Sequence, residues 1–500
     1  MLEEISPLSF TFVTVIFLSI AISKYLRRPD VDSIPTVGPG GLLTSYWGAL
    51  KFIFCAREML QEGYANHKGM AFKIPGLFCW NVFLSGHKLV EEMRKAPEDH
   101  ISVVERTSDI LKPKYTLGPE IIHNPYHTPI ILHQLTRSIA AKFPDMLDEI
   151  QTSFDDNIQL NGNEWTSVPA FGTVVKAMCR TSNRVLVGLP LCRDPDWNDL
   201  ATGFALSVIK TAIIIDLFPN FMAPVVGTLL SSLPRSMRRG MKHLRPIIEE
   251  RQKNLDEYGS DWDEKPSDLL SWLMDEAQGE ERSAENLVKR MLAINFTAIH
   301  SSSMMFTQAL YHLAENPQYV KPLREEVETI VEEEGWSKAA LTKMRKVDSF
   351  MKETLRFDNF AFLSLPRKAL KDFTFSNGIV VPAGCTVSVA SMPTHYDSEI
   401  YENADVFNPF RFANEKQEGE QAWHQMVSTN ADYLPFGHGR GSCPGRFFAA
   451  SELKTMLAHI VVTYDIKFED GAVRPTNITF GPASTPNMKA KLLFRKRVVE

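Results

Sequence analysis

The chain has 500 residues, of which 44% are hydrophobic and 23% are charged, and its formal net charge at pH 7 is −6. This composition is typical of a globular protein with a large core, and the acidic balance without a Lys/Arg stripe argues against nucleic-acid binding. No Gly/Ser linker, low-complexity segment or internal repeat divides the chain, so we expect one large domain.

The N-terminus carries an uncharged, mostly apolar segment, Leu8–Ile22, with two glutamates before it and three basic residues after it. We interpret residues 1–28 as a membrane anchor. A signal peptide is the alternative, but signal peptides begin with basic residues. Because positive flanking charge stays in the cytosol, the main domain should face the cytosol. Residues 29–45 contain a Pro- and Gly-rich stretch that predicts a stiff hinge, and residues 46–500 form the main domain.

A second apolar segment, Phe204–Leu230, has Lys210 and Asp216 as its only charges and is broken by Pro219 and Pro224. It has the composition of a membrane span. Its interior charges and prolines instead favour a helix, a loop and a second helix that lie on a membrane surface.

The longest helical pattern extends from Ala284 to Glu315 and is ended by Pro317. Its 32 residues would span about 48 Å at 1.5 Å per residue, which is enough to cross a whole domain. Its middle, FTAIHSSS (residues 296–303), combines small and apolar side chains with His300 and four hydroxyl groups.

Six cysteines are scattered along the chain without C-x-x-C pairs, so we expect neither a zinc site nor disulfides in a cytosolic domain. Five of them are interpreted as small buried hydrophobic residues. Cys443 differs, because it lies in FGHGRGSCPG (residues 436–445), directly before a helical pattern that starts at Arg446. A helix N-terminus favours a thiolate over a thiol. The loop by itself is compatible with a nucleophilic cysteine or with a haem-iron ligand.

Three motifs occur together in this chain: the spacing F-x-x-G-x-x-x-C-x-G in the cysteine loop, KETLRF (residues 352–357) and FNPFRF (residues 407–412). They resemble the haem-binding loop, the E-x-x-R helix and the P-x-R-F segment of cytochromes P450. The matching residues are Phe436, Gly439, Cys443 and Gly445 in the loop, Glu353 and Arg356 in the helix, and Arg411 in the third segment. The resemblance implies a mainly α fold with small β-sheets and an N-terminal membrane anchor, with residues 46–500 as the catalytic domain. It also implies that Cys443 is the thiolate ligand of haem b and that Glu353, Arg356 and Arg411 form a buried network.

The chain departs from this pattern near the expected haem propionates. The family usually carries a basic residue two positions before the cysteine, and here this residue is Gly441, with Arg440 one position earlier. Propionate binding would then depend on Arg137, which matches the arginine of the family's W-x-x-x-R helix, and on Arg367 in LSLPRKAL. His133 stands where the tryptophan of that helix is usual.

A second departure concerns proton delivery. His300 and Ser301 stand where the family usually has an acid and a threonine, and both residue types can carry protons to iron-bound dioxygen. The alternative interpretation of His300 is a histidine satisfied within the core. The A-I-H-S run resembles that of fungal P450s of terpenoid secondary metabolism.

The resemblance therefore implies a haem-thiolate monooxygenase in the endoplasmic reticulum membrane, with its catalytic domain in the cytosol. Its substrate would be lipophilic, terpenoid or steroid-like, and would enter from membrane lipid beneath a lid formed by Phe204–Leu230. Further pocket walls would come from the segment before Arg137, from residues 360–365 and from residues 481–486. Electrons would come from NADPH through NADPH-cytochrome P450 reductase, docking near Arg440, Arg446 and Lys454.

Two alternatives remain open from the sequence. A haem-thiolate isomerase or dehydratase would need no reductase, and the replaced acid–threonine pair favours it. A non-catalytic lipid-binding haem protein is the other alternative.

Overall fold

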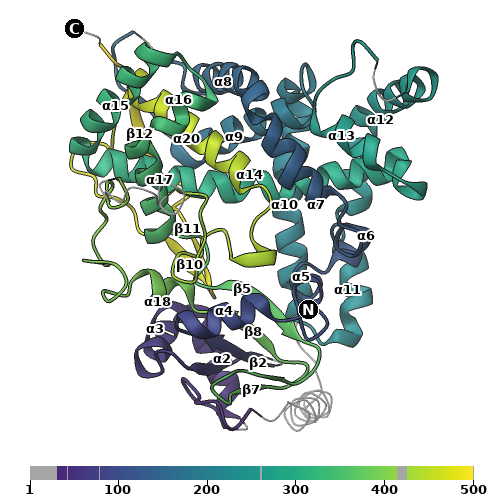
Figure 1. The fold of residues 1–500 in the computed structure, drawn as a ribbon, viewed down its shortest axis with the longest axis vertical. Coiled ribbons are helices and arrows are strands. Elements are labelled where there is room, and N and C mark those ends of the chain that lie inside the picture. Colours follow the sequence, from purple (N-terminus) through teal and green to yellow (C-terminus); the bar gives the residue numbers. More distant parts are fainter. Residues whose placement is uncertain are drawn as a thin grey trace, which may run out of the picture.

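The computed structural model describes residues 31–41, 43–77, 79–160, 162–259, 262–413 and 425–498. The predicted anchor, residues 1–28, lies outside these residues. Figure 1 shows most of the long helices in one half of the molecule and the largest sheet, with its short helices, in the other half. The predicted class, mainly α with small β-sheets, is confirmed.

The largest sheet has five strands in the order β1-β2-β8-β5-β3. All its neighbouring strands are antiparallel except β2 and β8, which are parallel. Its strands are β1 (Ala71–Pro75), β2 (Trp80–Leu84), β3 (Ile101–Ser102), β5 (Ser364–Ala369) and β8 (Thr386–Val389). The pairing of β5 with β8 shifts register between Ser364 and Arg367. Such an irregularity redirects the side chain that follows it, which here is Arg367.

Three smaller sheets complete the β structure. They are β4-β12-β9 (Thr166–Pro169, Lys491–Lys496 and Tyr464–Lys467), the hairpin β10-β11 (Ile478–Phe480 and Ala483–Thr485), and β6-β7 (Phe373–Thr374 and Val380–Val381).

The short helices lie beside the large sheet or connect longer helices. They are α2 (Thr44–Phe54), α3 (Ala56–Asn66), α4 (His87–Lys95), α5 (Val103–Leu111), α6 (Glu120–His123), α7 (His127–Pro129), α11 (Ala223–Leu230), α13 (Leu269–Glu276), α16 (Lys338–Lys343) and α18 (Ser391–His395). A π-helical turn, Ile130–Leu135, leads into α8.

The long helices build the larger core. They are α8 (Thr136–Ile158), α9 (Ala170–Leu186), α10 (Pro195–Asp216), α12 (Leu233–Tyr258), α14 (Ala284–Glu315), α15 (Val320–Glu334), α17 (Arg345–Phe357) and α20 (Arg446–Thr463).

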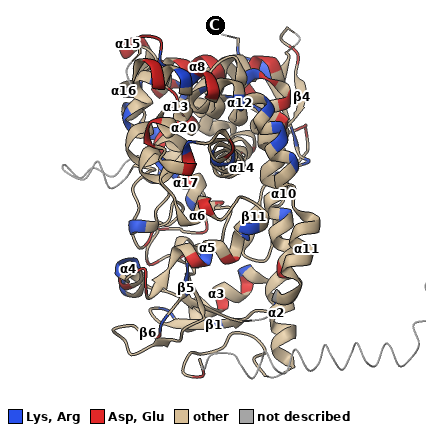
Figure 2. Cartoon of the chain, turned by 90° about the vertical axis from the view of Figure 1, so that its right-hand side faces the viewer, with Lys and Arg blue, Asp and Glu red and all other residues tan. Residues whose placement is uncertain are grey.

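Helix α14 has the bounds that the sequence predicted. The hydroxyl of Ser283 caps its start by accepting a hydrogen bond from the Asn286 amide at 3.3 Å, and Pro317 follows its end. Figure 2 shows α14 nearly end-on, with other helices around it. Since most of its side chains are buried, α14 is the central element against which the site is built.

The segment Phe204–Leu230 folds as a helix, a short connection and a second helix, as predicted. Among the described residues, α10 is the one helix long and apolar enough to cross a membrane, and only 44% of its most apolar window is buried inside the protein. Length and composition by themselves are weak evidence for a span, because core helices of soluble proteins meet the same criteria.

Part of the predicted hinge packs against the domain. Val31, Ile34 and Val37 are each at most 3% exposed. The amide of Lys73 in β1 donates to the Pro35 carbonyl at 2.8 Å, and the Val37 amide donates to the Lys73 carbonyl at 2.9 Å. Residues 31–37 therefore have fixed positions beside the sheet.

Candidate functional site

The loop before Cys443 is folded by its own backbone. The Cys443 amide donates to the Phe436 carbonyl at 2.8 Å, and the Ser442 amide donates to the Gly439 carbonyl at 3.1 Å. Gly437 and Gly439 have φ angles of 70° and 72°, which side-chain-bearing residues rarely adopt. The glycines are therefore needed to turn the chain so that it presents Cys443.

Cys443 lies at the N-terminus of α20, whose cap residue is Gly445. Enclosure by the surrounding atoms raises the pKa of the Cys443 thiol, while the backbone N–H groups of Gly445 and Arg446 oppose this rise. The protein atoms around the sulfur thus oppose the predicted preference for a thiolate, and a positive partner of the sulfur would be needed to favour it. All six cysteines are described, and Cys443 is the one that is exposed, although enough protein atoms lie near its sulfur to raise its pKa.

Helix α4 supports the outer side of the loop. His438 forms a 2.7 Å contact with the Glu91 carboxylate, which also accepts hydrogen bonds from Arg94 at 2.7 and 2.9 Å. Although burial works against it, the bonds from Arg94 and His438 hold the pKa of Glu91 below its ordinary value. A Cβ on Gly439 would lie 2.1 Å from the Arg94 Cγ atom. Gly439 is therefore required both for its φ angle and for this close packing.

Arg367 lies beside the loop on β5 and is only 6% exposed. Within the described residues its guanidinium has one hydrogen bond, to the Pro366 carbonyl at 3.0 Å, and no ion pair. Burial lowers the pKa of Arg367, and the charge of Glu98 partly opposes this effect. The Glu98 carboxylate itself accepts from Ser102 and from the first amides of α5. A buried guanidinium in this state is suited to an anionic ligand.

The other predicted propionate partners lie on the surface. Arg440, Arg137 and His133 are exposed, and the side chains of Arg137 and His133 make no hydrogen bond to the described residues. Arg137 and His133 line a surface pocket of about 720 Å³ that also includes Glu276 and Glu281. The structure therefore places Arg367 against Gly441 of the cysteine loop, whereas Arg137 and His133 line the surface pocket. The role of Arg137 and His133 in propionate binding stays a prediction.

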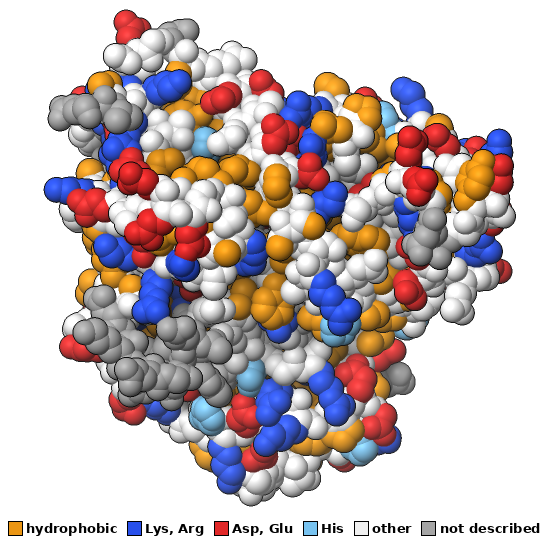
Figure 3. Space-filling model, turned by 45° about the horizontal axis from the view of Figure 1, so that its top comes forward, with side chains coloured by type: hydrophobic (Ala, Val, Ile, Leu, Met, Phe, Trp, Pro, Cys, Tyr) orange, Lys and Arg blue, Asp and Glu red, His pale blue; other side chains and the backbone are white. Residues whose placement is uncertain are grey.

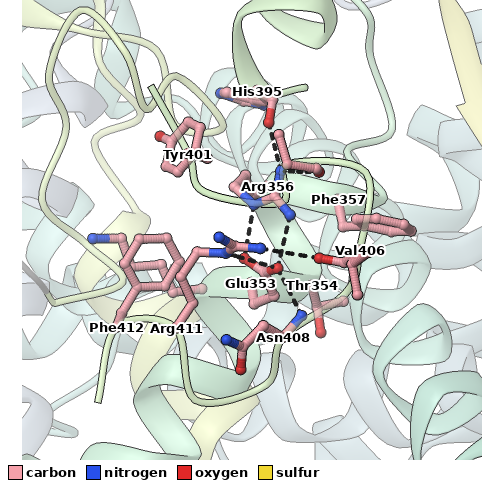
Figure 4. A network of polar contacts seen from close by, with 12 residues as sticks. Glu353, Thr354, Arg356, Phe357, His395, Tyr401, Val406, Asn408, Arg411 and Phe412 are labelled. Carbon is pink, nitrogen blue, oxygen red and sulfur yellow. Dashed lines mark hydrogen bonds and ion pairs between the residues drawn. The ribbon is translucent and has the colours of Figure 1, made fainter. Parts of the chain in front are cut away.

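Glu353, Arg356 and Arg411 form one buried network, which Figure 4 shows. Glu353 and Arg356 on α17 are at most 1% exposed and are joined by two hydrogen bonds of 2.7 Å. Arg411 Nε donates to both Glu353 oxygens at 3.1 Å, and the Asn408 amide donates to Oε1 at 3.0 Å.

The third guanidinium nitrogen of Arg356, Nη1, extends the network to the end of α18 and the chain that follows it. It donates to the carbonyls of His395 and Ala404, the latter at 2.9 Å. The His395 ring accepts from the Leu434 amide at 3.1 Å. The network thus positions the start of the loop that ends at Cys443.

Comparison with known proteins identifies this arrangement. Residues 78–494 match the family model described as "Cytochrome P450". The chain belongs to the cytochrome P450 family. Membership implies a haem-thiolate cofactor and an oxidoreductase that incorporates dioxygen, so the predicted family, enzyme class and cofactor are confirmed.

Similar sequences come from fungi. Cytochrome P450 monooxygenase 151 of Postia placenta is 42% identical over 99% of this chain and 100% of its own length. Cytochrome P450 monooxygenase CYP512U6 of Ganoderma lucidum is 34% identical, covering 95% of this chain and 93% of its own. Cytochrome P450 monooxygenase paxQ of Penicillium paxilli is 32% identical over 98% and 97%.

Among solved structures, the fold is similar to that of retinoic acid-bound cyanobacterial CYP120A1. The TM-score is 0.69 at 18% sequence identity, and the match covers 93% of this chain and 99% of the other. At this identity the likeness confirms the P450 fold and nothing finer.

In this P450 the predicted relay residues lie in the middle of α14. The His300 ring, through Nε2, donates to the Thr202 carbonyl of α10 at 2.9 Å. The Ser301 hydroxyl donates to the Thr297 carbonyl, one turn back, at 3.0 Å. His300 is half-buried, and its bond joins the predicted relay helix to α10 at Thr202, two residues before the predicted lid begins at Phe204.

Sequence reasoning missed Arg290, which is fully buried on α14 of this P450. Its guanidinium donates to the Asn124 carbonyl at 3.0 Å, to the His127 Nδ1 at 2.8 Å and to the Glu281 carboxylate at 2.8 Å. It also lies 4.1 Å from the centroid of the Tyr126 ring. Burial and the Arg290 charge lower the pKa of His127 to about 4, so its ring is a neutral acceptor. Arg290 thus fixes the predicted pocket wall before Arg137. A charged residue in an apolar helical stretch was the available signal.

Proposed function

We propose that this P450 is a monooxygenase in which Cys443 is the axial thiolate and a lipophilic, terpenoid or steroid-like substrate is hydroxylated. The single observation that supports the ligand assignment is the exposed Cys443 side chain at the N-terminus of α20. The other cysteines are buried or half-buried elsewhere in the fold.

The residues around Cys443 suit a haem with two carboxylates. Arg367 is a buried cation without an anionic partner among the described residues. Gly441 and Gly445 have no side chains, so the loop can approach a flat ligand closely. When bound, the haem supplies dioxygen activation, which electron donation from a thiolate favours. The N–H groups of Gly445 and Arg446 stabilise negative charge on the sulfur.

His300 and Ser301 are the proposed proton carriers. Their position in the middle of α14 and the polar contacts of both side chains support this role. The Ser301 hydroxyl can pass on a proton while it accepts one from solvent, and the two ring nitrogens of His300 can donate and accept protons.

Exposed apolar side chains support a membrane location for the lid. Figure 2 shows α2, α10 and α11 along one side of the molecule. The exposed apolar residues on these helices include Trp47, Leu50, Phe54, Leu206, Ile209, Ile213, Val225 and Leu229. Exposed apolar side chains on several helices of one side are typical of a lipid or partner contact. Together with the predicted anchor, it supports placement on the endoplasmic reticulum membrane and entry of substrate from lipid.

The face that Figure 3 presents carries charge of both signs, with Lys and Arg side chains interspersed among Asp and Glu side chains. Three basic residues were expected at the reductase contact, and the prediction for Lys454 is wrong. It is 7% exposed and forms a 2.8 Å ion pair with Asp348. Arg440 remains an exposed candidate, and electron supply from NADPH through the reductase remains part of the proposal.

The test is a Cys443→Ser variant with Cys55→Ser as its control. Reduced wild-type protein with CO should absorb at the wavelength typical of thiolate-ligated haem, and only Cys443→Ser should lose this band. A band that persists in Cys443→Ser would contradict the assignment. Turnover of a terpenoid mixture that requires NADPH, reductase and O₂ would support the monooxygenase. Turnover without them would instead support the isomerase or dehydratase.

A further inference from the structure

A buried polar cluster joins α14 to the chain just before the C-terminal hairpin β10-β11. Gln308, His312 and Asp358 are at most 9% exposed, and the Arg474 side chain is 14% exposed. Arg474 donates to the Asp358 carboxylate at 2.7 Å and to the Gln308 side-chain oxygen at 2.8 Å. These four residues and Asn477 are called the C-terminal clamp below.

The histidine of the C-terminal clamp lies between the carboxylate of Asp358 and the guanidinium of Arg474. Burial lowers the pKa of His312 despite the opposing effect of Asp358, so the ring is neutral at pH 7. Its Nε2 lies 2.7 Å from the Asp358 carboxylate, while Arg474 Nη1 lies 3.1 Å from Nδ1 and 3.0 Å from Nε2. A ring that donates through Nε2 to Asp358 keeps Nδ1 as the acceptor that faces Arg474. The ring is also stacked on Phe407, with centroids 3.6 Å apart.

Asn477 connects the cluster directly to the hairpin, because β10 begins at the next residue. It donates to the Asp358 carboxylate at 3.0 Å and accepts from the Gln308 amide at 2.9 Å. Beyond the other strand of the hairpin, the Tyr311 hydroxyl donates to the Asn487 carbonyl at 2.7 Å. Helix α14 therefore holds the hairpin at both of its ends.

The held hairpin in turn holds residues 360–362. The Ser484 amide donates to the Phe360 carbonyl, and the Phe362 amide donates to the Pro482 carbonyl, both at 2.8 Å. These are the two segments predicted to line the substrate pocket. Gln308 and His312 follow Ser301 on the same helix by about two and three turns.

We infer that the C-terminal clamp positions the hairpin and residues 360–362 as one rigid wall of the substrate pocket, with Arg474 and Asp358 as positioning residues. The inference rests on the proposed haem site for its effect on ligands. Burial makes the cluster effective, because a charge-assisted hydrogen bond inside a protein is stronger than one in water. If the wall is fixed before binding, less entropy is lost when it is ordered around a bulky ligand. A small ligand that does not reach the wall is unaffected.

The test compares two iron-binding probes, imidazole and 4-phenylimidazole, by the shift of the haem absorption band. Arg474→Met should weaken 4-phenylimidazole binding about fivefold or more and leave imidazole binding unchanged. Arg474→Lys keeps the charge and should restore part of the loss. Asp470→Ala is the matched control, because it removes an exposed ion pair with Lys467 in the same C-terminal segment. Unchanged or tighter 4-phenylimidazole binding in Arg474→Met, or an equal loss for imidazole, would overturn the inference.

Asn477→Ala covers the case in which Arg474→Met does not accumulate, because it removes only two hydrogen bonds and should produce the same selective loss. Amide hydrogen exchange of residues 478–485 measures local opening of the hairpin directly, and it should be faster in either variant. This measurement remains decisive if no variant binds an azole, an outcome that would count against the haem site. Wild-type exchange rates in both variants would contradict the clamp.

Discussion

The guanidinium of Arg367 occupies the space that a side chain at position 441 would need. A Cβ on Gly441 would lie only 2.6 Å from Arg367 Nη2. Gly441 has no positive φ, so backbone strain does not require glycine there. The departure of this chain from the usual P450 loop is therefore paired with the position of a buried arginine on β5.

Gly441→Arg should weaken haem retention, although it introduces the basic residue that the family usually carries. The new side chain must displace Arg367, whose loss as a propionate partner removes a charge-assisted hydrogen bond. We expect haem transfer to apomyoglobin to become roughly 10- to 100-fold faster. Arg367→Gln should show a similar increase. Gly203→Arg is the control, since its Cβ would meet no atom within 4 Å. Equal or slower transfer from Gly441→Arg would contradict the pairing.

Glu353→Ala should destabilise the protein strongly. The change leaves Arg356 and Arg411 facing a site without its carboxylate, and an uncompensated buried charge costs about 3–5 kcal/mol. Urea unfolding followed by loss of the haem band measures the effect, and the yield of haem-loaded protein should fall with it. Glu325→Ala is the control, because it removes an exposed pair with Lys321 that is worth under about 1 kcal/mol. Similar stability of the two variants would exclude a structural role for the buried network.

Ser301→Ala should uncouple NADPH consumption from product formation. Proton delivery by a positioned group contributes about 10²- to 10⁴-fold, so product should fall while peroxide rises and the substrate-induced spectral change persists. His300→Ala should have a smaller effect on coupling if water replaces the ring. It also removes the bond to Thr202, so it should alter substrate affinity as well. Product yield per NADPH near the wild-type value in both variants would assign proton delivery to water or substrate.

Glu452 makes stability depend on pH. Burial raises the pKa of this carboxyl group on α20 to about 8, and a hydrogen bond from Ser182 at 2.9 Å only partly opposes the rise. The folded state keeps its proton up to that pH, whereas the unfolded chain loses it near pH 4.5. The unfolded state therefore binds fewer protons between these values, and stability falls as pH rises from about 4.5 to about 8.

Glu452→Gln should remove this dependence. We expect the thermal midpoint of the variant to exceed that of the wild type at pH 8 and to match or fall below it at pH 5. Glu332→Gln is the control at an exposed position. A wild-type midpoint at least as high as that of the variant at pH 8 would mean that Glu452 is ionised in the folded protein.

Local patterns in the sequence determined the main elements. The helical pattern from Ala284 and the proline at 317 after it were sufficient to place α14, because helix ends depend on local backbone groups. The glycines before Cys443 predicted a tight loop for the same reason. The order and spacing of three motifs were sufficient for the family and its cofactor.

Only the tertiary structure decided which charged residues meet. Arg367 and Gly441 are far apart in sequence. The close approach of the Arg367 side chain to Gly441 depends on the register shift in β5 and on the fold of the loop. Lys454 has the same sequence signature as an exposed lysine, yet packing of α20 against α17 buries it beside Asp348. Arg290 and the C-terminal clamp were unpredictable for a related reason. A buried charge is stable only with its partners, and those partners come from distant segments that the fold brings together.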